Sequence, residues 1–342
     1  MRILVTGASG FVGRWLTREL DAHGHDAVPM PPSAALDLAD AASVGAFIRA
    51  AAPDAIAHLA AVSFAGDARR NPGEALRVNV GGTAVVLEAA RRLPRRPVML
   101  VAGSSEAYGP PRREDLPLRE DAPLLPSTPY GLSKLAQEAV ALEIASQAGL
   151  ALVVTRSFNH IGPGQRADFV VPALAARVLA VVRGEATTIA VGNIDVRRDF
   201  TDVRDVVRAY RLLLEASAAG TLPSPRTVVN VASGRPVSIR SIADMLRRLA
   251  GCEADLVVDP ALVRTDDPPE IAGDASLLAE LTGWEPEIHL RQTLADILAA
   301  PGAVQRASTR RPWSDAKVAR EDHAPGTSDS AVACGVTASN AE

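Results

Sequence analysis

Cysteine is almost absent from this 342-residue chain, which contains only Cys252 and Cys334. Two cysteines without a Cys-x-x-Cys pair do not suit a disulfide framework or a thiolate metal cluster. The chain also lacks the run of ~20 apolar residues that a membrane span needs. Its N-terminus enters the apolar run Ile3-Leu4-Val5 without a charged leader. We therefore expect a cytoplasmic protein that carries no metal and does not contact a membrane.

A large excess of one charge sign is lacking as well. The 36 basic and 40 acidic side chains leave a formal net charge of −4, and no Lys- or Arg-rich block marks a nucleic-acid binder. Lysine is scarce, because Lys134 and Lys317 are the only two among those 36 basic residues. Since the chain uses Arg where charge alone matters, Lys134 indicates a site that needs a compact ammonium group.

Short apolar, β-rich runs alternate with longer helical patterns through the first half of the chain. This alternation predicts βαβ units and an α/β fold with a doubly wound parallel sheet of the Rossmann type. Gly24 and Gly149 follow two of the predicted helices, where a glycine would end them. The predicted strands cover residues 2–6, 55–59, 98–102 and 152–156, and the predicted helices cover 11–23, 43–51, 81–92 and 129–148.

The alternation of β-rich runs and helical patterns becomes irregular after residue 160. This change predicts a second, differently built part of the chain. Residues 1–160 are expected to form the Rossmann core, with later segments near 190–232 returning to it. Residues 161–300 are expected to form mainly a smaller, interleaved substrate lobe. Residues 301–342 lack periodicity and are predicted to be a disordered tail. The elements predicted after residue 160 are helices at 171–183, 238–250 and 290–299 and strand-like pieces at 188–191 and 228–231.

A glycine-rich turn, Thr6 to Gly13, follows the first predicted strand and opens the first predicted helix. Gly7 permits the tight turn, Gly10 lets the backbone approach a pyrophosphate, and Gly13 allows the helix to pack closely on the strand. The N-terminus of the helix then faces the phosphate charge. This strand-turn-helix context predicts dinucleotide binding.

Tyr130 and Lys134 lie four residues apart on one face of the predicted helix at 129–148, which Ser127 or Thr128 could cap. A tyrosine with a pKa of about 10 is a poor proton carrier at neutral pH, and a fixed cation beside it would lower that pKa. Tyr130 would then protonate a carbonyl oxygen as a hydride reaches its carbon. An incidental pair on an exposed helix is the alternative, and the glycine turn and the scarcity of lysine disfavour it.

The glycine spacing and the Tyr-x-x-x-Lys pair resemble the extended short-chain dehydrogenase/reductase family, in its nucleotide-sugar branch, over residues 2 to about 300. The resemblance implies an oxidoreductase that uses NADPH or NADH. The end of the second strand, Pro29–Ser33, carries neither an Asp nor a phosphate-binding Arg, so the preference between NAD and NADP stays open. The implied cofactor-binding residues are Gly7, Ser9, Gly10, Phe11, Gly13, Asp37, Leu38, Leu59, Ala60, Ala61, Asn79, Tyr130 and Lys134.

The segment Gly103–Gly109 follows a predicted strand and resembles the third catalytic segment of the family. By its place in that segment, Ser104 is implied to donate its hydroxyl to the substrate carbonyl. Glu106 falls where sugar-nucleotide dehydratases of this branch keep a base. Its role stays open, because a carboxylate that supports the loop or binds a substrate hydroxyl fits the position equally.

The run from Phe158 to Gln165 is similar to members of this branch that act on a GDP-linked 4-keto-6-deoxy sugar. The resemblance implies Ser63, Asn159, Arg198 and Arg264 as substrate-binding residues. Guanidinium groups suit a diphosphate because they pair with its oxygens bidentately. Surface ion pairing is the alternative for any single Arg in this Arg-rich chain.

The resemblance implies NAD(P)H-dependent reduction of the C4 keto group of GDP-4-keto-6-deoxy-D-mannose, giving GDP-D-rhamnose or its C4 epimer GDP-6-deoxy-D-talose. One alternative is a GDP-mannose 4,6-dehydratase or another nucleotide-sugar epimerase or dehydratase. A second alternative is a non-catalytic NAD(P)-sensing binding protein. Family members commonly dimerise through the helices that include the Tyr-Lys helix, so a homodimer is expected.

Overall fold

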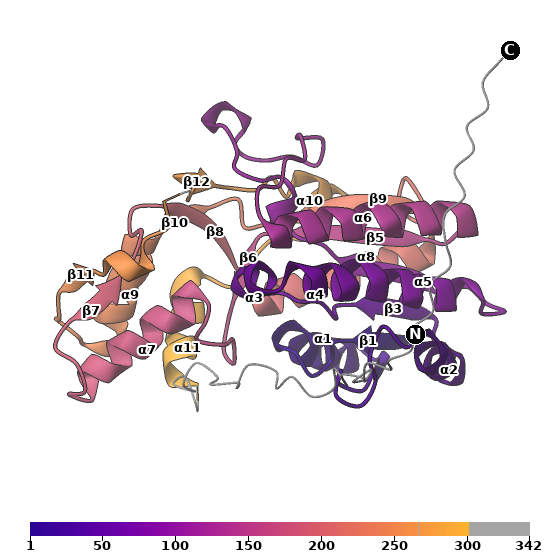
Figure 1. The fold of residues 1–342 in the computed structure, drawn as a ribbon, viewed down its shortest axis with the longest axis horizontal. Helices are drawn as coiled ribbons and strands as arrows, with labels where there is room; N and C mark the ends of the chain where they lie inside the picture. Colours follow the sequence, from indigo (N-terminus) through magenta and orange to yellow (C-terminus); the bar gives the residue numbers. More distant parts are fainter. Residues whose placement is uncertain (266, 301–342) are drawn as a thin grey trace, which may run out of the picture. The chain divides into compact units, whose positions relative to one another are not determined.

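A six-stranded sheet in the order β2-β1-β3-β4-β5-β9 forms the centre of the fold (Figure 1). The structure is a computed structural model that describes residues 1–265 and 267–300. All neighbouring strands of this sheet are parallel, which confirms the predicted Rossmann-type architecture. The strands are β1 (Arg2–Thr6), β2 (Asp26–Pro29), β3 (Ala55–His58), β4 (Val98–Ala102), β5 (Leu152–Ser157) and β9 (Arg226–Val231).

Helices cover both faces of this sheet. Successive side chains of a strand point to opposite faces, so Ile3 and Val5 pack in one apolar core and Leu4 packs in another. Because both faces are buried, we expect ligands to bind at the edge formed by the carboxyl ends of the strands. One core contains α1 (Phe11–Ala22), α8 (Val203–Ala219) and α10 (Ser276–Thr282), and the other contains α2 (Ala41–Ala51), α5 (Thr83–Arg91) and α6 (Pro129–Ala148).

The helix predicted at 81–92 is part of a longer helical stretch. Pro72 lies in the first turn of this stretch, and the Asn71 side chain caps it by accepting a hydrogen bond from Glu74 N. The helical stretch therefore begins nine residues earlier than predicted. Gly24 and Gly149 do end their helices with positive φ angles of 77° and 62°, as predicted. The stretch comprises α4 (Pro72–Leu76), the π-helical η1 (Arg77–Gly82) and α5, and it follows α3 (Ala65–Arg70); short 3₁₀ turns are η2 (Ser105–Ala107) and η3 (Arg113–Asp115).

Segments after residue 158 build a second, smaller arrangement around β8 (Arg197–Asp202). Strands β6 and β12 pair with β8 in parallel and β10 pairs with it antiparallel. Residues 1–300 nevertheless lie within one compact unit, so the division near residue 160 stays a prediction. The further elements are β6 (Asn159–Ile161), α7 (Val170–Val182), β7 (Ile189–Val191), β10 (Pro236–Ser238), α9 (Ile239–Ala250), β11 (Leu256–Val258), η4 (Pro260–Leu262), β12 (Glu270–Ile271) and α11 (Leu290–Ala299).

Helix α8 is absent from the predicted elements, although its sequence carries the signals of a helix. Asp202 caps its N-terminus by accepting a hydrogen bond from Arg204 N, and Gly220 ends it with φ of 68°. Its buried positions Val203, Val206, Val207, Tyr210, Leu213 and Leu214 follow helical spacing. The short strand β8, which runs directly into α8, hides the change of period in the sequence.

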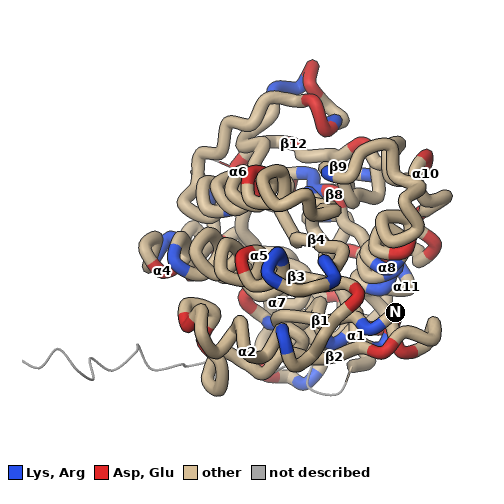
Figure 2. The backbone as a smooth tube through the Cα atoms, turned by 90° about the vertical axis from the view of Figure 1, so that its right-hand side faces the viewer, with Lys and Arg blue, Asp and Glu red and all other residues tan. Residues whose placement is uncertain are grey.

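Charges of both signs are interspersed along the chain (Figure 2). Within residues 1–265 and 267–300, no helix has the length and apolarity needed to cross a membrane. The tail predicted at 301–342 lies outside the described residues.

Candidate active site

The glycine turn has the backbone geometry that its sequence predicts. Gly7 has a φ of 68°, and a Cβ there would lie 2.8 Å from Ala60 N. A Cβ on Gly13 would collide with Gly7 O, so the close contact of helix and turn requires glycine. Gly10 is the N-cap of α1 and no side chain caps it. The N-terminus of α1 is therefore suited to the diphosphate of a dinucleotide.

Residues 162–165, which are distant from this turn in the sequence, pack against it in the fold. Arg14 donates hydrogen bonds to Ser9 O (2.8 Å) and to Gly164 O (3.3 Å), and the Trp15 indole donates to Pro163 O at 3.2 Å. Phe11 stacks on His160 with ring centroids 6.2 Å apart. The run that resembles enzymes acting on a GDP-linked sugar thus meets the predicted cofactor site.

The loop after β3 is held from two sides. The Thr6 hydroxyl oxygen accepts hydrogen bonds from Leu59 N and Ala60 N, each at 3.1 Å. The buried Asn79 side chain accepts from Val62 N at 2.7 Å and donates to Val62 O at 3.2 Å. Leu59, Ala60 and Asn79, which the family resemblance implies as cofactor residues, are therefore brought together, and Ala61 lies within this loop.

Tyr130 lies at the N-terminus of α6, which Thr128 caps by accepting a hydrogen bond from Gly131 N at 3.0 Å, as predicted. Burial raises the pKa of Tyr130, and a hydrogen bond with Ser104 acts in the opposite direction. Ser104 is itself buried at the end of β4 and precedes η2. The predicted Ser-Tyr pair is thus in contact beyond the carboxyl end of the sheet.

Lys134 corrects one expectation of the sequence analysis. Its ammonium donates to Ala102 O and to Gln137 Oε1, both at 2.6 Å, and burial lowers its pKa to about 7. The sequence analysis expects this cation to lower the pKa of Tyr130, whereas burial raises it. A raised pKa keeps the phenol protonated at neutral pH, and this is the form that a proton donor needs.

Glu106 occupies the mouth of this site. Its side chain is exposed, and its Oε2 accepts a hydrogen bond from the Thr128 hydroxyl at 3.3 Å. Burial raises the pKa of Tyr130 and the negative charge of Glu106 adds to that rise, whereas burial lowers the pKa of Arg198 and the same charge opposes that fall. Glu106 therefore lies near both Tyr130 and one of the predicted substrate arginines.

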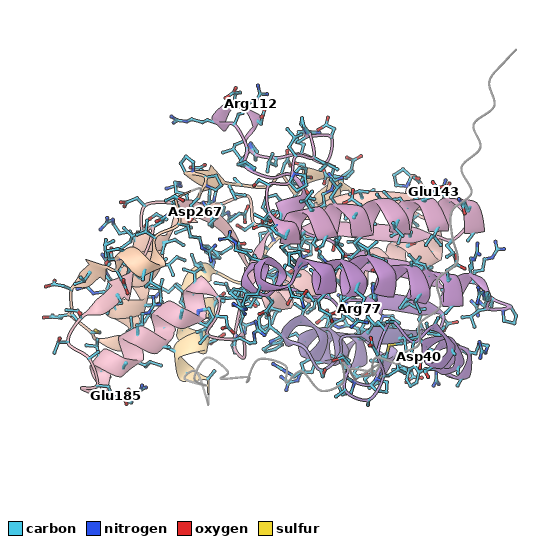
Figure 3. The ribbon with its side chains drawn as sticks, in the orientation of Figure 1. Asp40, Arg77, Arg112, Glu143, Glu185 and Asp267 are labelled. Atoms are coloured by element: carbon cyan, nitrogen blue, oxygen red, sulfur yellow. The ribbon has the colours of Figure 1, made fainter. Side chains whose placement is uncertain are left out.

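The predicted diphosphate arginines lie near each other, and one of them is ion-paired. Arg198 is 9% exposed, and its Nη2 lies 2.8 Å from Asp267 Oδ1. Burial lowers the pKa of Arg198, and the positive charge of the exposed Arg264 contributes in the same direction. Figure 3 shows Asp267 beside β8 and β12. Asn193 holds the backbone of Arg264 through bonds at 2.6 and 3.2 Å, a support that the sequence analysis did not identify.

The two other predicted substrate residues, Asn159 and Ser63, are both exposed. Asn159 begins β6 and pairs with Phe200, two residues after Arg198. Ser63 is exposed on the loop after β3, and no described contact connects it to the arginines. Their roles stay predictions.

The predicted adenine contacts lie beside α4 and α5. Asp37 accepts two hydrogen bonds of 3.2 Å from Arg77 Nη1, and Arg77 appears on that side of the molecule in Figure 3. A hydrogen bond from Ala39 N and the pairing with Arg77 lower the pKa of Asp37. Leu38 is buried and packs against Gly82. In the described part of the chain, no group of His, Cys, Asp and Glu could hold a metal ion.

Sequence reasoning also missed two buried polar residues near Lys134. The sequence analysis assigns no role to His58 or to Gln137, yet both are at most 1% exposed. The signal for Gln137 is its position one turn after Lys134 on the inward face of α6.

Comparisons with known proteins agree with this geometry. The model of the NAD-dependent epimerase/dehydratase family matches residues 3–232. The chain is 36% identical to a GDP-6-deoxy-D-mannose reductase of Pseudomonas aeruginosa, covering 87% of this chain and 96% of that protein. It is 25% identical to a GDP-mannose 4,6-dehydratase of Vibrio cholerae, covering 77% of each. A solved structure of RMD from Pseudomonas aeruginosa with NADPH has a TM-score of 0.79 at 35% identity, covering 87% of this chain and 98% of that one.

Proposed function

This chain belongs to the NAD-dependent epimerase/dehydratase family, and we propose that it reduces the C4 keto group of GDP-4-keto-6-deoxy-D-mannose. The product is GDP-D-rhamnose or its C4 epimer GDP-6-deoxy-D-talose. The observation that carries the proposal is the contact of Ser104 with Tyr130 on the helix that carries Lys134. The greater identity to the reductase than to the dehydratase supports the same reaction.

The glycine turn and the loop Leu59–Ala61 would hold NADPH or NADH, which supplies the hydride when bound. Ser104 donates its hydroxyl to the C4 carbonyl oxygen and polarises the carbonyl. Tyr130 gives its phenolic proton to that oxygen as it becomes a hydroxyl, and takes up another proton from solvent afterwards. Lys134 hydrogen-bonds the nicotinamide ribose with the N–H that its two protein acceptors leave free.

A protonated Tyr130 is the form with which a reduction begins. A dehydratase or epimerase first oxidises its sugar, so its tyrosine must begin as a proton acceptor. Burial of Tyr130 and the negative charge of Glu106 both disfavour that phenolate. Glu106 would then bind a sugar hydroxyl, and Arg198 and Arg264 would bind the diphosphate.

The homodimer is proposed on the outer face of α6 and the stretch that precedes α5. Leu132 on α6 is 53% exposed and Leu76 on α4 is 47% exposed, and these two helices contact each other. A twofold axis would bury this face against itself. Sedimentation analysis is expected to give a dimer for the wild type and a monomer for Leu132→Glu, and a monomeric wild type would contradict this assembly.

The reaction is tested by incubating the protein with GDP-4-keto-6-deoxymannose, GDP-mannose and UDP-glucose, each with NADPH or NADH. We expect oxidation of one reduced cofactor per molecule of the 4-keto sugar, with the C4 configuration of the product read by NMR. Turnover of GDP-mannose without net cofactor oxidation would establish a dehydratase instead. Cofactor binding without turnover of any sugar nucleotide would indicate the NAD(P)-sensing alternative.

A further inference from the structure

Lys134 carries a buried ammonium whose surroundings are almost free of charge. The residue is 3% exposed, and its two protein acceptors are the carbonyl oxygens of Ala102 and of the Gln137 side chain, both at 2.6 Å. Gln137 itself is 1% exposed. A buried ammonium is costly unless acceptors satisfy it, so the orientation of the Gln137 amide matters for Lys134.

The Thr83 hydroxyl fixes the orientation of that amide. Thr83 Oγ1 receives a hydrogen bond from Gln137 Nε2 at 2.9 Å and donates its own proton to Asn79 O at 2.6 Å. His58 Nε2 lies 2.9 Å from the same hydroxyl oxygen. Because the single hydroxyl proton is already used, His58 must carry its proton on Nε2 and donate it to Thr83.

His58 connects this group to the cofactor loop. Burial, followed by the nearby charge of Lys134, lowers the pKa of His58 to about 3. The ring is therefore neutral, and its Nδ1 accepts a hydrogen bond from the Thr6 hydroxyl at 2.8 Å. Thr6 in turn accepts from the backbone N–H groups of Leu59 and Ala60. Hydrogen bonds thus run in one consistent direction from the loop 59–60, and from Lys134, toward Thr83 and Asn79.

We propose that Gln137 is a positioning residue that holds the Lys134 ammonium toward the nicotinamide ribose, with Thr83 and His58 locking the Gln137 amide. The inference rests on the proposed function, because it assigns Lys134 to the cofactor. Through His58 and Thr6, the same hydrogen bonds fix the cofactor loop relative to α6. Groups from β1, β3, α5 and α6 thereby fix the position of the cofactor loop relative to the Lys134 ammonium.

The proposal predicts how substitutions of Gln137 move the titration of Lys134. His58 from β3 is the titratable group whose pKa responds to the charge of Lys134, and Tyr130 lies one turn before Lys134 on α6. Strand β4 and helix α5 contribute the neutral Ala102 carbonyl and Thr83. The pKa of His58 is lowered and that of Tyr130 is raised, so neither changes charge between about pH 6 and pH 9. Lys134, with a pKa of about 7, does change charge there.

The experiment measures NADPH affinity against pH by cofactor fluorescence, for the full chain and for Gln137→Leu and Gln137→Glu. Ala102 O and Gln137 Oε1 take two N–H groups of Lys134, so only the ammonium form has a third N–H left for the ribose. We therefore expect wild-type affinity to fall as the pH rises through about 7. Gln137→Leu removes an acceptor and moves the midpoint of this loss to lower pH. Gln137→Glu adds a negative charge and moves the midpoint up by about 1–3 pH units. Titration of the cofactor itself is common to all variants and does not affect the comparison.

Gln147 provides the matched control, because it lies on the same helix, is exposed and bonds only to Glu143 on that helix at 2.7 Å. Gln147→Leu and Gln147→Glu are expected to keep the wild-type midpoint. Equal loss of affinity in both Gln137 variants, with an unmoved midpoint, would overturn the proposal. If Gln137→Leu does not fold, Gln137→Glu decides alone by the direction of its shift. Because the readout is binding, a lack of turnover refutes the proposed reaction without affecting this test.

Discussion

The cofactor side and the substrate side of the candidate site are built from different interactions. On the cofactor side, neutral side chains surround one ammonium, and short hydrogen bonds give each of them a defined partner. On the substrate side, Arg198 is held by the carboxylate of Asp267 and Arg264 is exposed. The first side is fixed before a ligand arrives, whereas the second contains an ion pair whose carboxylate a diphosphate can replace.

This difference follows from burial. Hydrogen bonds between neutral buried groups have strict geometry and are costly to leave unmade, so they preserve one arrangement. An ion pair near solvent is weaker and tolerates exchange of its anion. Substitutions on the cofactor side should therefore affect chemistry or folding, and substitutions on the substrate side should affect KM.

The largest effect is expected for Tyr130→Phe, which removes the proton donor. We expect kcat to fall roughly 10²–10⁴-fold, while the Kd for NADPH changes little because the ring remains. Stopped-flow measurement of cofactor oxidation gives kcat, and fluorescence titration gives Kd. Tyr210→Phe is the control for the loss of a buried phenol, since the Tyr210 hydroxyl shares a hydrogen bond with Ser157 and has no proposed part in the reaction. Wild-type kcat in Tyr130→Phe would refute the mechanism.

A second large effect is expected for Arg156→Leu, through stability. Arg156 and Glu138 of α6 are each 5% exposed and are joined by bonds of 2.6 and 3.0 Å. Removing the guanidinium leaves a buried unpaired carboxylate, and the free energy of unfolding should fall by about 3–5 kcal/mol. Urea denaturation measures it. Arg240→Leu, whose ion pair with Asp195 is exposed, should remain close to the wild type, and an equal loss in both variants would contradict the comparison.

On the substrate side, Arg198→Gln removes a charged partner of the proposed diphosphate. Hydrogen bonds to charged groups are worth about 1.5–3 kcal/mol, so KM for the sugar nucleotide should rise roughly 10–100-fold with a smaller change in kcat. The adjacent Arg197, which pairs with Glu270 at 2.9 Å and is 48% exposed, serves as control. A large rise of KM in Arg197→Gln alone would transfer the role to that residue.

The smallest effect is expected for Asp267→Asn. The diphosphate then no longer competes with a carboxylate for Arg198, and KM should fall by about two- to fivefold, the scale of a partly exposed ion pair. Steady-state kinetics at two salt concentrations measure it, since screening weakens the competing pair in the wild type. An unchanged KM would mean that Asp267 stays paired when the substrate is bound.

Sequence reasoning reached the cofactor side further than the substrate side. The glycine turn, the Thr128 cap and the Tyr130–Lys134 spacing depend on local backbone geometry, which neighbouring residues determine. The ion pair of Arg198 with Asp267 joins positions 69 residues apart, so no local sequence pattern predicts it. The predicted lowering of the Tyr130 pKa was wrong for the same reason, since the burial that raises this pKa depends on the packed fold.

The sequence by itself determined the parallel α/β framework, the glycine turn and the identity of the candidate reacting groups, since apolar periodicity, glycine and caps act over a few residues. Tertiary structure alone decided where the Lys134 ammonium points and which carboxylate holds Arg198. It also decided that β9 takes the outer position of the main sheet, beside β5. These outcomes depend on which distant side chains share a buried volume, because desolvation makes a polar group take the nearest available partner.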